Sequence, residues 1–152
     1  MRIRSVPSRR SRGFSLIELM VAVVVIAILA SLAYPSFMGS IRKGRRAEAF
    51  AALTAVQQAQ ERWRANNSSY ASSLSSLGLS STTAGGLYGI ALANTGNTGY
   101  EAIATGVSGS SQYDDGGCAK LGVKLDGGNL TYGGSTAGGS LSYTVTSPCW
   151  SR

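Results

Sequence analysis

The sequence contains no histidine, and this absence removes most metal sites and every catalytic triad that depends on imidazole. Only seven acidic residues are present, and the only carboxylate pair at a useful spacing is the adjacent Asp114 and Asp115. No glycine-rich phosphate loop precedes a helix, and no nucleophile has an evident base. We therefore expect that the protein is not an enzyme and that it has no cofactor and no metal ion.

Large aliphatic residues are scarce outside one stretch near the N-terminus, residues 14–33. The later part of the chain is rich in glycine, serine, threonine and alanine, which bury little apolar surface. With 152 residues, the chain suits one domain that has a small core and long irregular connections. A covalent crosslink would help to stabilise such a domain.

Cysteine is nearly absent, since Cys118 and Cys149 are the only two. Both follow the apolar stretch, and the basic leader before that stretch indicates export to an oxidising compartment. The simplest prediction is a disulfide, which would constrain the unfolded chain by roughly 3–4 kcal/mol in the loop-entropy model. Two free thiols and a metal-binding pair are the alternatives.

The net charge of +7 is typical of nucleic-acid-binding proteins, but its distribution weakens that interpretation. Residues 1–13 form a leader that holds five of the fourteen cationic residues and no acidic residue. Without the leader, nine cationic and seven acidic residues remain, so the mature chain has a charge near +2. Positive leaders stay on the cytoplasmic side of a membrane, and we interpret this one as a processing signal.

Residues 14–34 form an apolar segment whose only charged residue is Glu18. As a helix this segment would rise about 32 Å, which is enough to cross a hydrocarbon core. An acidic side chain at the centre of a bilayer helix costs roughly 2.5–3.5 kcal/mol, so a carboxylate in such a segment indicates a function.

Residues 35–66 are expected to continue the helix as an amphipathic half, after a kink at Pro35 and Gly39. The apolar residues of this half recur every three or four positions, as Phe50, Leu53, Val56, Ala59 or Gln60, and Trp63. A basic cluster precedes them: Arg42, Lys43, Arg45 and Arg46. This cluster is either a solvated helix face or a contact for phospholipid headgroups or for acidic groups of neighbouring subunits.

Residues 67–86 form a serine- and threonine-rich connection, and residues 87–152 then alternate with a period of two. The apolar positions of the alternating segments are Tyr88, Ile90 and Leu92; Leu121, Val123 and Leu125; and Leu141, Tyr143 and Val145. A fourth strand is expected at 100–107, and turn residues between the strands predict an antiparallel meander. The amphipathic half of the helix can cover the apolar face of this sheet.

The leader that ends in Gly13, the run from Phe14 to Met20, the apolar helix and Pro35 resemble the type IV prepilins. In that family a glycine before the cut, an aromatic first mature residue and a glutamate at the fifth position are recognised by a prepilin peptidase. The peptidase cleaves on the cytoplasmic side and methylates the new amine. The resemblance implies that Gly13 and Phe14 flank the scissile bond and that Phe14 becomes N-methylated.

Later motifs resemble the pilin subgroup that includes the PilE-type minor pilins and the DNA-uptake pilin ComP. The matching motifs are Tyr34-Pro35, Arg45-Arg46-Ala47-Glu48-Ala49, Gln60-Glu61-Arg62-Trp63, the segment 67–70, and Cys149-Trp150. This resemblance implies the α+β type IV pilin fold, in which a long N-terminal helix packs on a roughly four-stranded antiparallel sheet. It also implies that the disulfide closes a C-terminal loop.

The resemblance to prepilins suggests a role for Glu18. Removal of Gly13 gives Phe14 a cationic amine, which lies one helical turn from Glu18. An amine and a carboxylate are each costly in a low dielectric, but they offset one another when they are paired. A pair between neighbouring subunits would fix the axial register of assembly, because a shift by one residue leaves both charges unmatched.

The predicted function is therefore a structural subunit of a type IV pilus, a minor pilin that polymerises through its N-terminal helix. It would serve motility, adhesion or DNA uptake. The precursor would reside in the bacterial inner membrane before the subunit enters the extracellular pilus. The expected partners are other pilin subunits, the prepilin peptidase, the inner-membrane assembly platform and membrane lipid, with DNA as a further candidate.

Two alternatives use the same N-terminal residues. A secretory signal cut after Ser31-Leu32-Ala33 would release a soluble protein, but Glu18 lies inside what would be its apolar region. A pseudopilin of type II secretion would share the helix, and a calcium site is usual in major pseudopilins. Asp114, Asp115 and Asp126 are the candidate calcium ligands, although acidic residues in glycine-rich loops are more often turn formers.

DNA binding is compatible with pilin identity. The candidate phosphate contacts are Arg62, Arg64, Lys120, Lys124 and Arg152, and the candidate stacking partners are Tyr132 and Trp150. Since the mature charge is only near +2, solvated surface side chains are the competing interpretation of these cations.

Overall fold

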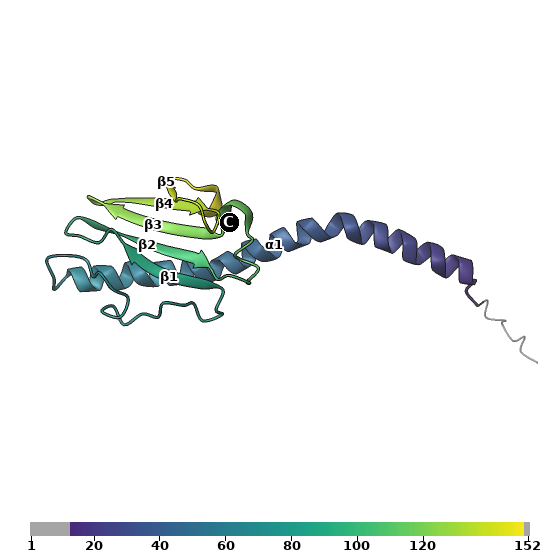
Figure 1. The fold of residues 1–152 in the computed structure, drawn as a ribbon, viewed down its shortest axis with the longest axis horizontal. Helices are drawn as coiled ribbons and strands as arrows, with labels where there is room; N and C mark the ends of the chain where they lie inside the picture. The colour runs from purple at the N-terminus through teal and green to yellow at the C-terminus, as the bar shows by residue number, and fades with distance from the viewer. Residues whose placement is uncertain (1–12, 151–152) are drawn as a thin grey trace, which may run out of the picture. The chain divides into compact units, whose positions relative to one another are not determined.

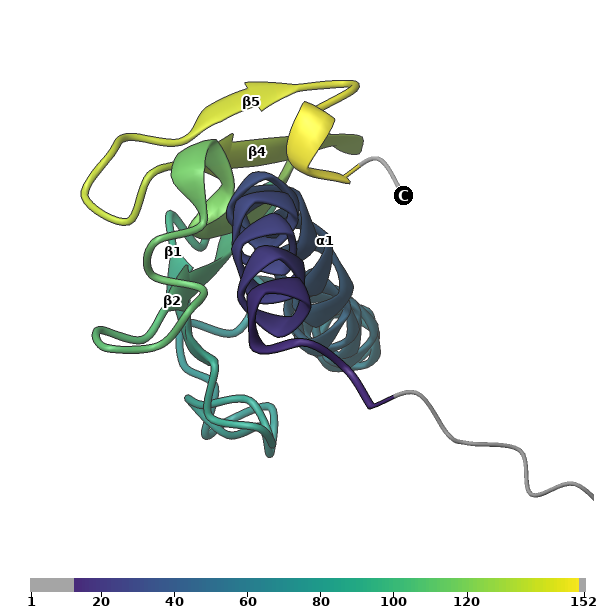
Figure 2. The same ribbon diagram turned by 90° about the vertical axis from the view of Figure 1, so that its right-hand side faces the viewer.

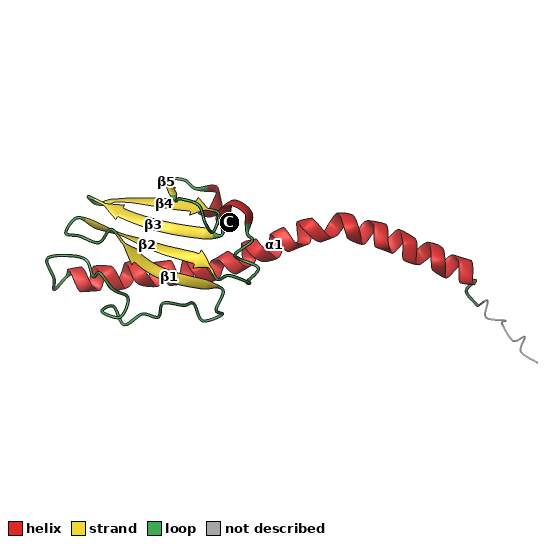
Figure 3. Ribbon diagram, in the orientation of Figure 1, coloured by secondary structure: helices red, strands yellow, loops and turns green. Residues whose placement is uncertain are grey.

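The computed structural model describes residues 13–150, and Figures 1 and 3 show its single long helix and its sheet. The elements are, in chain order, α1 (Leu16–Arg64), β1 (Tyr88–Ala93), β2 (Gly99–Gly106), the 3-10 turn η1 (Gly116–Cys118), β3 (Lys120–Asp126), β4 (Asn129–Ser135), β5 (Ser142–Thr144) and the 3-10 turn η2 (Pro148–Trp150). The chain divides into two compact units, Met1–Phe37 and Met38–Arg152. The predicted leader lies outside the described residues except for Gly13.

The described part of the first unit is the apolar portion of α1. Each side chain from Phe14 to Phe37 is exposed, and Phe14 itself is 81% exposed. By length and composition, α1 contains a stretch that can cross a membrane. A helix that is apolar on all sides requires lipid or other helices around it.

Pro35 and Gly39 lie inside α1, whose helical backbone continues past both residues. The described chain therefore has no unwound turn at this point, and the kink expected there stays a prediction. Proline removes one backbone hydrogen bond and glycine adds backbone freedom, so this stretch is expected to be the easiest part of α1 to unwind.

The second unit contains the sheet, in which five strands pair in the order β1-β2-β3-β4-β5. All four pairings are antiparallel, so the predicted meander is confirmed. Gly127 and Gly128 form the two-residue turn between β3 and β4, with φ of 56° and 86°. Positive φ at both positions is the requirement of the tight turns that match the twist of a hairpin.

The sheet has five strands where about four were expected, and β4 is the strand that sequence reasoning missed. Its sequence ends in Gly133 and Gly134, which lower strand propensity. A side chain at Gly134 would collide with the sulfur of Cys149, and one at Gly133 would collide with Tyr143. The two glycines therefore allow Cys149 to pack closely on one face of β4 and Tyr143 to pack closely on the other.

The core lies between the second half of α1 and one face of the sheet. Its residues are Ala49, Leu53 and Val56 from α1, with Tyr88, Ile90, Tyr100, Ala102, Ala104, Leu121, Val123 and Cys149. The predicted stripe on α1 is confirmed in large part, and Trp63 at its end is only half-buried. The core is small, as expected, because alanine fills two of the central positions in β2.

Gln60 is fully buried on the same stripe, and both polar atoms of its side chain are hydrogen-bonded. Nε2 donates to the carbonyl of Ala71 at 2.9 Å, and Oε1 accepts from the amide of Ala71 at 2.9 Å. Because these two hydrogen bonds are buried, they hold the backbone of Ala71 in place beside the helix. Gln60 therefore attaches the connection after α1 to the helix.

The placement of β5 contradicts the prediction that Tyr143 faces the helix. Tyr143 pairs with Gly133, which pairs with Gly122, so these residues share the outer face of the sheet. The Tyr143 ring passes over both glycines, and its hydroxyl donates to Glu101. Burial raises the pKa of Tyr143, and this hydrogen bond raises it further. A shift of one residue in the register of a strand moves each side chain to the opposite face of the sheet. The space above Gly122 and Gly133 favours the register that places Tyr143 on the outer face.

The predicted disulfide between Cys118 and Cys149 is confirmed. It joins η1 to η2, and the 31-residue separation between the cysteines contains β3, β4 and β5. Figure 2 shows β5 outside β4 and η2 turning back toward α1. The bond therefore holds the C-terminal strands as a closed loop beside the helix.

Replacing both Cys118 and Cys149 by serine is expected to lower the free energy of unfolding by about 3–4 kcal/mol, because the unfolded chain regains the freedom that the closed loop removes. Urea unfolding of the full chain in detergent measures this change. Reduction of the unmodified protein should produce the same loss, and reductant should leave the double variant unchanged. A loss below about 1 kcal/mol would show that the crosslink contributes little.

Candidate functional site

The first candidate site is the N-terminal group of Gly13, Phe14 and Glu18. Gly13 and Phe14 precede α1, and Glu18 lies in its first turn. The unpaired amides of a helix N-terminus favour a carboxylate at this position. Glu18 has no ion-pair partner among residues 13–150. Its carboxylate is thus available to a cation from outside the described chain.

The partner proposed for Glu18 does not exist in the uncut chain. The nitrogen of Phe14 belongs to a peptide bond and carries no charge while Gly13 is attached. Cleavage after Gly13 would convert this nitrogen into an amine, which is protonated at neutral pH. The proposed site would therefore become complete only through processing.

The candidate DNA contacts are only partly brought together. Arg62 and Arg64 lie in the last turn of α1, and Lys124 lies near the end of β3. Arg62 lines a shallow depression together with Leu125 and Leu130 of the β3–β4 hairpin. This shared depression places the end of α1 beside the hairpin that carries Lys124. We call Arg62, Arg64 and Lys124 the cationic end of the second unit.

Two of these cations already have partners within the chain. Arg64 donates to the carbonyls of Asn67 at 2.6 Å and Asn97 at 3.4 Å, and its guanidinium lies 5.7 Å from the ring centre of Tyr70. Lys124 lies 3.1 Å from the carboxylate of Asp126. That pair is exposed, and exposed pairs contribute at most about 1 kcal/mol.

The remaining candidates lie elsewhere. Lys120 begins β3, at the opposite end of the strand from Lys124, and its Nζ donates to the carbonyl of Gly139 at 2.9 Å. Arg152 lies outside the described residues. Tyr132 and Trp150 face the helix side of the sheet, whereas Lys120 and Lys124 lie on the other face. The structure therefore separates the proposed stacking residues from these two lysines.

The basic cluster on α1 has a role that neither sequence interpretation anticipated. Arg46 donates from Nε to Asp115 at 2.6 Å and from a second nitrogen at 2.9 Å, and both side chains are about nine-tenths buried. The hydrogen bond to Asp115 raises the pKa of Arg46. Arg45 donates to Ser111 in the same β2–β3 connection. Part of the cluster thus attaches this connection to α1.

The candidate calcium ligands are not assembled into a site. Asp115 is engaged by Arg46, and Asp126 is paired with Lys124 at the far end of β3. Within residues 13–150, no group of three side chains suited to metal binding is found.

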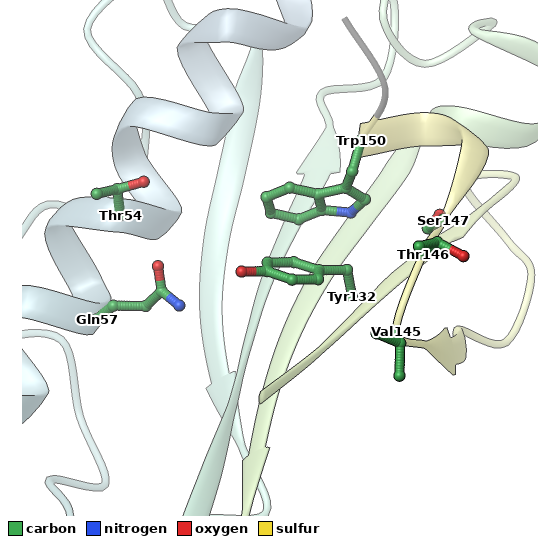
Figure 4. Close-up of a pocket in the computed structure, with 7 residues that line it drawn as sticks. All are labelled: Thr54, Gln57, Tyr132, Val145, Thr146, Ser147 and Trp150. Atoms are coloured by element: carbon green, nitrogen blue, oxygen red, sulfur yellow. The ribbon is translucent and has the colours of Figure 1, made fainter. Parts of the chain in front are cut away.

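A groove lies beside the C-terminal 3-10 turn of the second unit, and sequence reasoning missed most of it. It has a volume of about 450 Å³, and Figure 4 shows its lining residues: Thr54, Gln57, Tyr132, Val145, Thr146, Ser147 and Trp150. We call it the C-terminal groove. The signal that could have indicated it is the stretch 127–150, which contains no charged residue.

Comparison with known proteins gives two adjoining matches. The family described as "Type IV minor pilin ComP, DNA uptake sequence receptor" matches residues 35–122, more than half of the chain. The family described as "Prokaryotic N-terminal methylation motif" matches residues 8–34. The second match covers the expected cleavage site and the apolar segment, and the first begins at Pro35.

Individual relatives are found among type II secretion proteins. The type II secretion system core protein G of Dickeya chrysanthemi is 36% identical over 70 residues, which cover 46% of this chain and 46% of the relative. The protein of the same name from Klebsiella pneumoniae is 36% identical over 62 residues, which cover 41% and 44%. The chain thus matches less than half the length of these curated relatives.

Proposed function

Because the chain belongs to the family of the type IV minor pilin ComP, we propose that it is a minor pilus subunit that contacts DNA during uptake. The observation that carries this proposal is the pair of adjoining family matches. Together they cover the exposed apolar part of α1, its amphipathic part and the chain as far as the start of β3. Pilin subunits assemble with one another, and this chain has the apolar helix that such assembly requires.

The first step in this function is processing at the membrane. We propose that the precursor is held in the inner membrane by residues 14–34 and that a prepilin peptidase cuts between Gly13 and Phe14. Both residues precede α1, so a peptidase could reach the bond without unwinding the helix. Methylation would follow on the Phe14 amine, and the assembly platform would then move the subunit from lipid into the filament.

A pseudopilin of type II secretion is the second candidate function. The 36% identity to two core proteins G favours it. The ComP family match extends over a larger part of the chain, and the cysteine-closed C-terminal loop resembles pilins. We therefore prefer the pilus.

The DNA contact is assigned to the cationic end. Lys124 can exchange its exposed partner Asp126 for a phosphate at little cost. Arg62 is exposed, and the partners of Arg64 are two backbone carbonyls, which carry no counter-charge. Three cations at one end of a domain suit a short stretch of backbone phosphates, with an affinity that falls steeply as salt is added.

Replacing Arg62 and Lys124 together by glutamine is expected to reduce the slope of log K against log salt by about two, one for each phosphate that the variant no longer neutralises. Binding of full-length mature protein in detergent to a fluorescent duplex, measured over a salt series, gives this slope. Lys120→Gln is the control, because it removes one positive charge from the other end of β3 and should leave the slope unchanged. An unchanged slope in the double variant would contradict the placement, and absence of binding at low salt would remove the DNA contact.

A further inference from the structure

We propose that the C-terminal groove binds an uncharged saccharide, an activity distinct from both pilus assembly and the DNA contact. The groove lies between one turn of α1 and the segment that leads from β5 into η2. Figure 4 shows Thr54 and Gln57 on the helix side and Val145, Thr146 and Ser147 on the other, with Tyr132 and Trp150 between them.

Neutrality is the first property that restricts the ligand. None of the seven lining residues carries a charge, and five of them come from the uncharged stretch 127–150. A phosphate-rich or carboxylate-rich ligand would find no counter-charge in this lining. An uncharged ligand needs no counter-charge from this lining.

The aromatic residues supply a rigid floor. Trp150 lies between Phe50, at 4.8 Å between ring centres, and Tyr132, at 4.7 Å. Its Nε1 donates to the carbonyl of Gly133 at 2.9 Å, so the indole is fixed. Trp150 is the only ring neighbour of Tyr132 among the described residues, and the rest of the Tyr132 ring borders the groove. An aromatic face of this kind packs well against the C–H surface of a sugar ring.

Four side chains of the lining have polar groups that are unused within the described chain. The amide of Gln57 and the hydroxyls of Thr54, Tyr132 and Ser147 have no hydrogen-bond partner among residues 13–150. They surround the aromatic floor with donors and acceptors, which the hydroxyls of a saccharide can match. An aliphatic ligand would displace water from these groups without replacing its hydrogen bonds, which would weaken binding.

The dimensions fit the same class of ligand. The volume of about 450 Å³ lies within the range of about 300–1,000 Å³ that is usual for small-ligand sites. In a lining of this kind, the aromatic surface contacts the ligand, and a few neutral polar groups fix the orientation of the ligand without any charged contact. We infer that one or two sugar rings occupy the groove, with a ring face on Tyr132 and hydroxyls at Gln57 and Thr54.

The experiment uses full-length mature protein in a detergent that has no sugar headgroup, so that the detergent does not compete. Neutral oligosaccharides of glucose, galactose and N-acetylhexosamine are screened by saturation-transfer NMR, and affinities are measured by titration. At least one of them should bind, and its affinity should be the same at low and high salt. The Gln57→Ala variant should weaken binding about three- to tenfold, and Gln57→Ala with Thr54→Val by at least tenfold.

Gln58→Ala is the matched control, because Gln58 is the next residue of α1 and does not line the groove. Both glutamine variants place alanine in a helix, so they should fold alike, which circular dichroism checks. Equal loss of affinity in the Gln57 and Gln58 variants would overturn the assignment. So would the failure of every neutral saccharide to bind at about 10 mM, or tighter binding of an oligonucleotide that Gln57→Ala weakens.

Discussion

Glu18→Ala is expected to leave processing and membrane insertion intact and to reduce incorporation into filaments by about two to four orders of magnitude. The expected size follows from the cost of about 3–5 kcal/mol for removing one partner of a buried ion pair. In this case the orphaned group is the amine of Phe14, which would be left in lipid or among apolar helices. The side chain removed makes no ion pair among residues 13–150, so the second unit should keep its stability.

The loss is expected to be so large because Glu18 would act between subunits. Residues 14–37 have exposed apolar side chains on all sides of the helix, and apolar contacts alone fix no particular axial position. In the proposed pairing, a single carboxylate and a single amine per subunit would supply that position, since a neighbour out of register would satisfy neither charge. In a helical filament the subunits do not form a closed ring, so the same contact between neighbouring subunits repeats along the whole polymer.

Immunoblots of sheared filaments and of membranes, with mass spectrometry of the N-terminus, measure incorporation and processing separately. Gly13→Asp is the contrasting variant, because it should leave the leader attached and so block the step before assembly. Glu18→Asp keeps the charge on a shorter side chain and should recover part of the incorporation. Normal amounts of Glu18→Ala subunit in the filaments would rule out the pairing.

The long helix and the meander could be predicted because their signals are local. Helical periodicity on α1 identified Leu53, Val56 and the buried pair Ala59 and Gln60. Alternation identified the inner faces of β1 and β3, and the glycine pair between β3 and β4 indicated a hairpin turn. In each case the residues that determine the structure are neighbours in the sequence.

The features that were missed depend on residues distant in the sequence. The room that draws Tyr143 to the outer face comes from Gly122 and Gly133, on two other strands. Gly133 and its neighbour Gly134 also made β4 look like a loop. The C-terminal groove combines Thr54 and Gln57 with residues that lie 75 to 96 positions later in the chain. A single sequence contains no signal that pairs such residues.

Arg46 is the clearest example, and its replacement by leucine is expected to lower the free energy of unfolding of the second unit by about 3–5 kcal/mol. The substitution leaves the carboxylate of Asp115, which is 8% exposed, without its cation. Sixty-nine residues separate the two, so the pair attaches α1 to the β2–β3 connection. Urea unfolding of the full chain in detergent measures the loss.

Two comparisons separate the buried charge from a general effect of losing an arginine. Arg45→Leu removes a neighbouring cation that is exposed and donates only to Ser111, so its cost should stay below about 1 kcal/mol. Arg46→Leu combined with Asp115→Leu removes both charges, and the double variant should recover most of the stability that the single variant loses. If the double variant were no more stable than Arg46→Leu alone, packing of the arginine side chain, and not the unpaired carboxylate, would account for the loss.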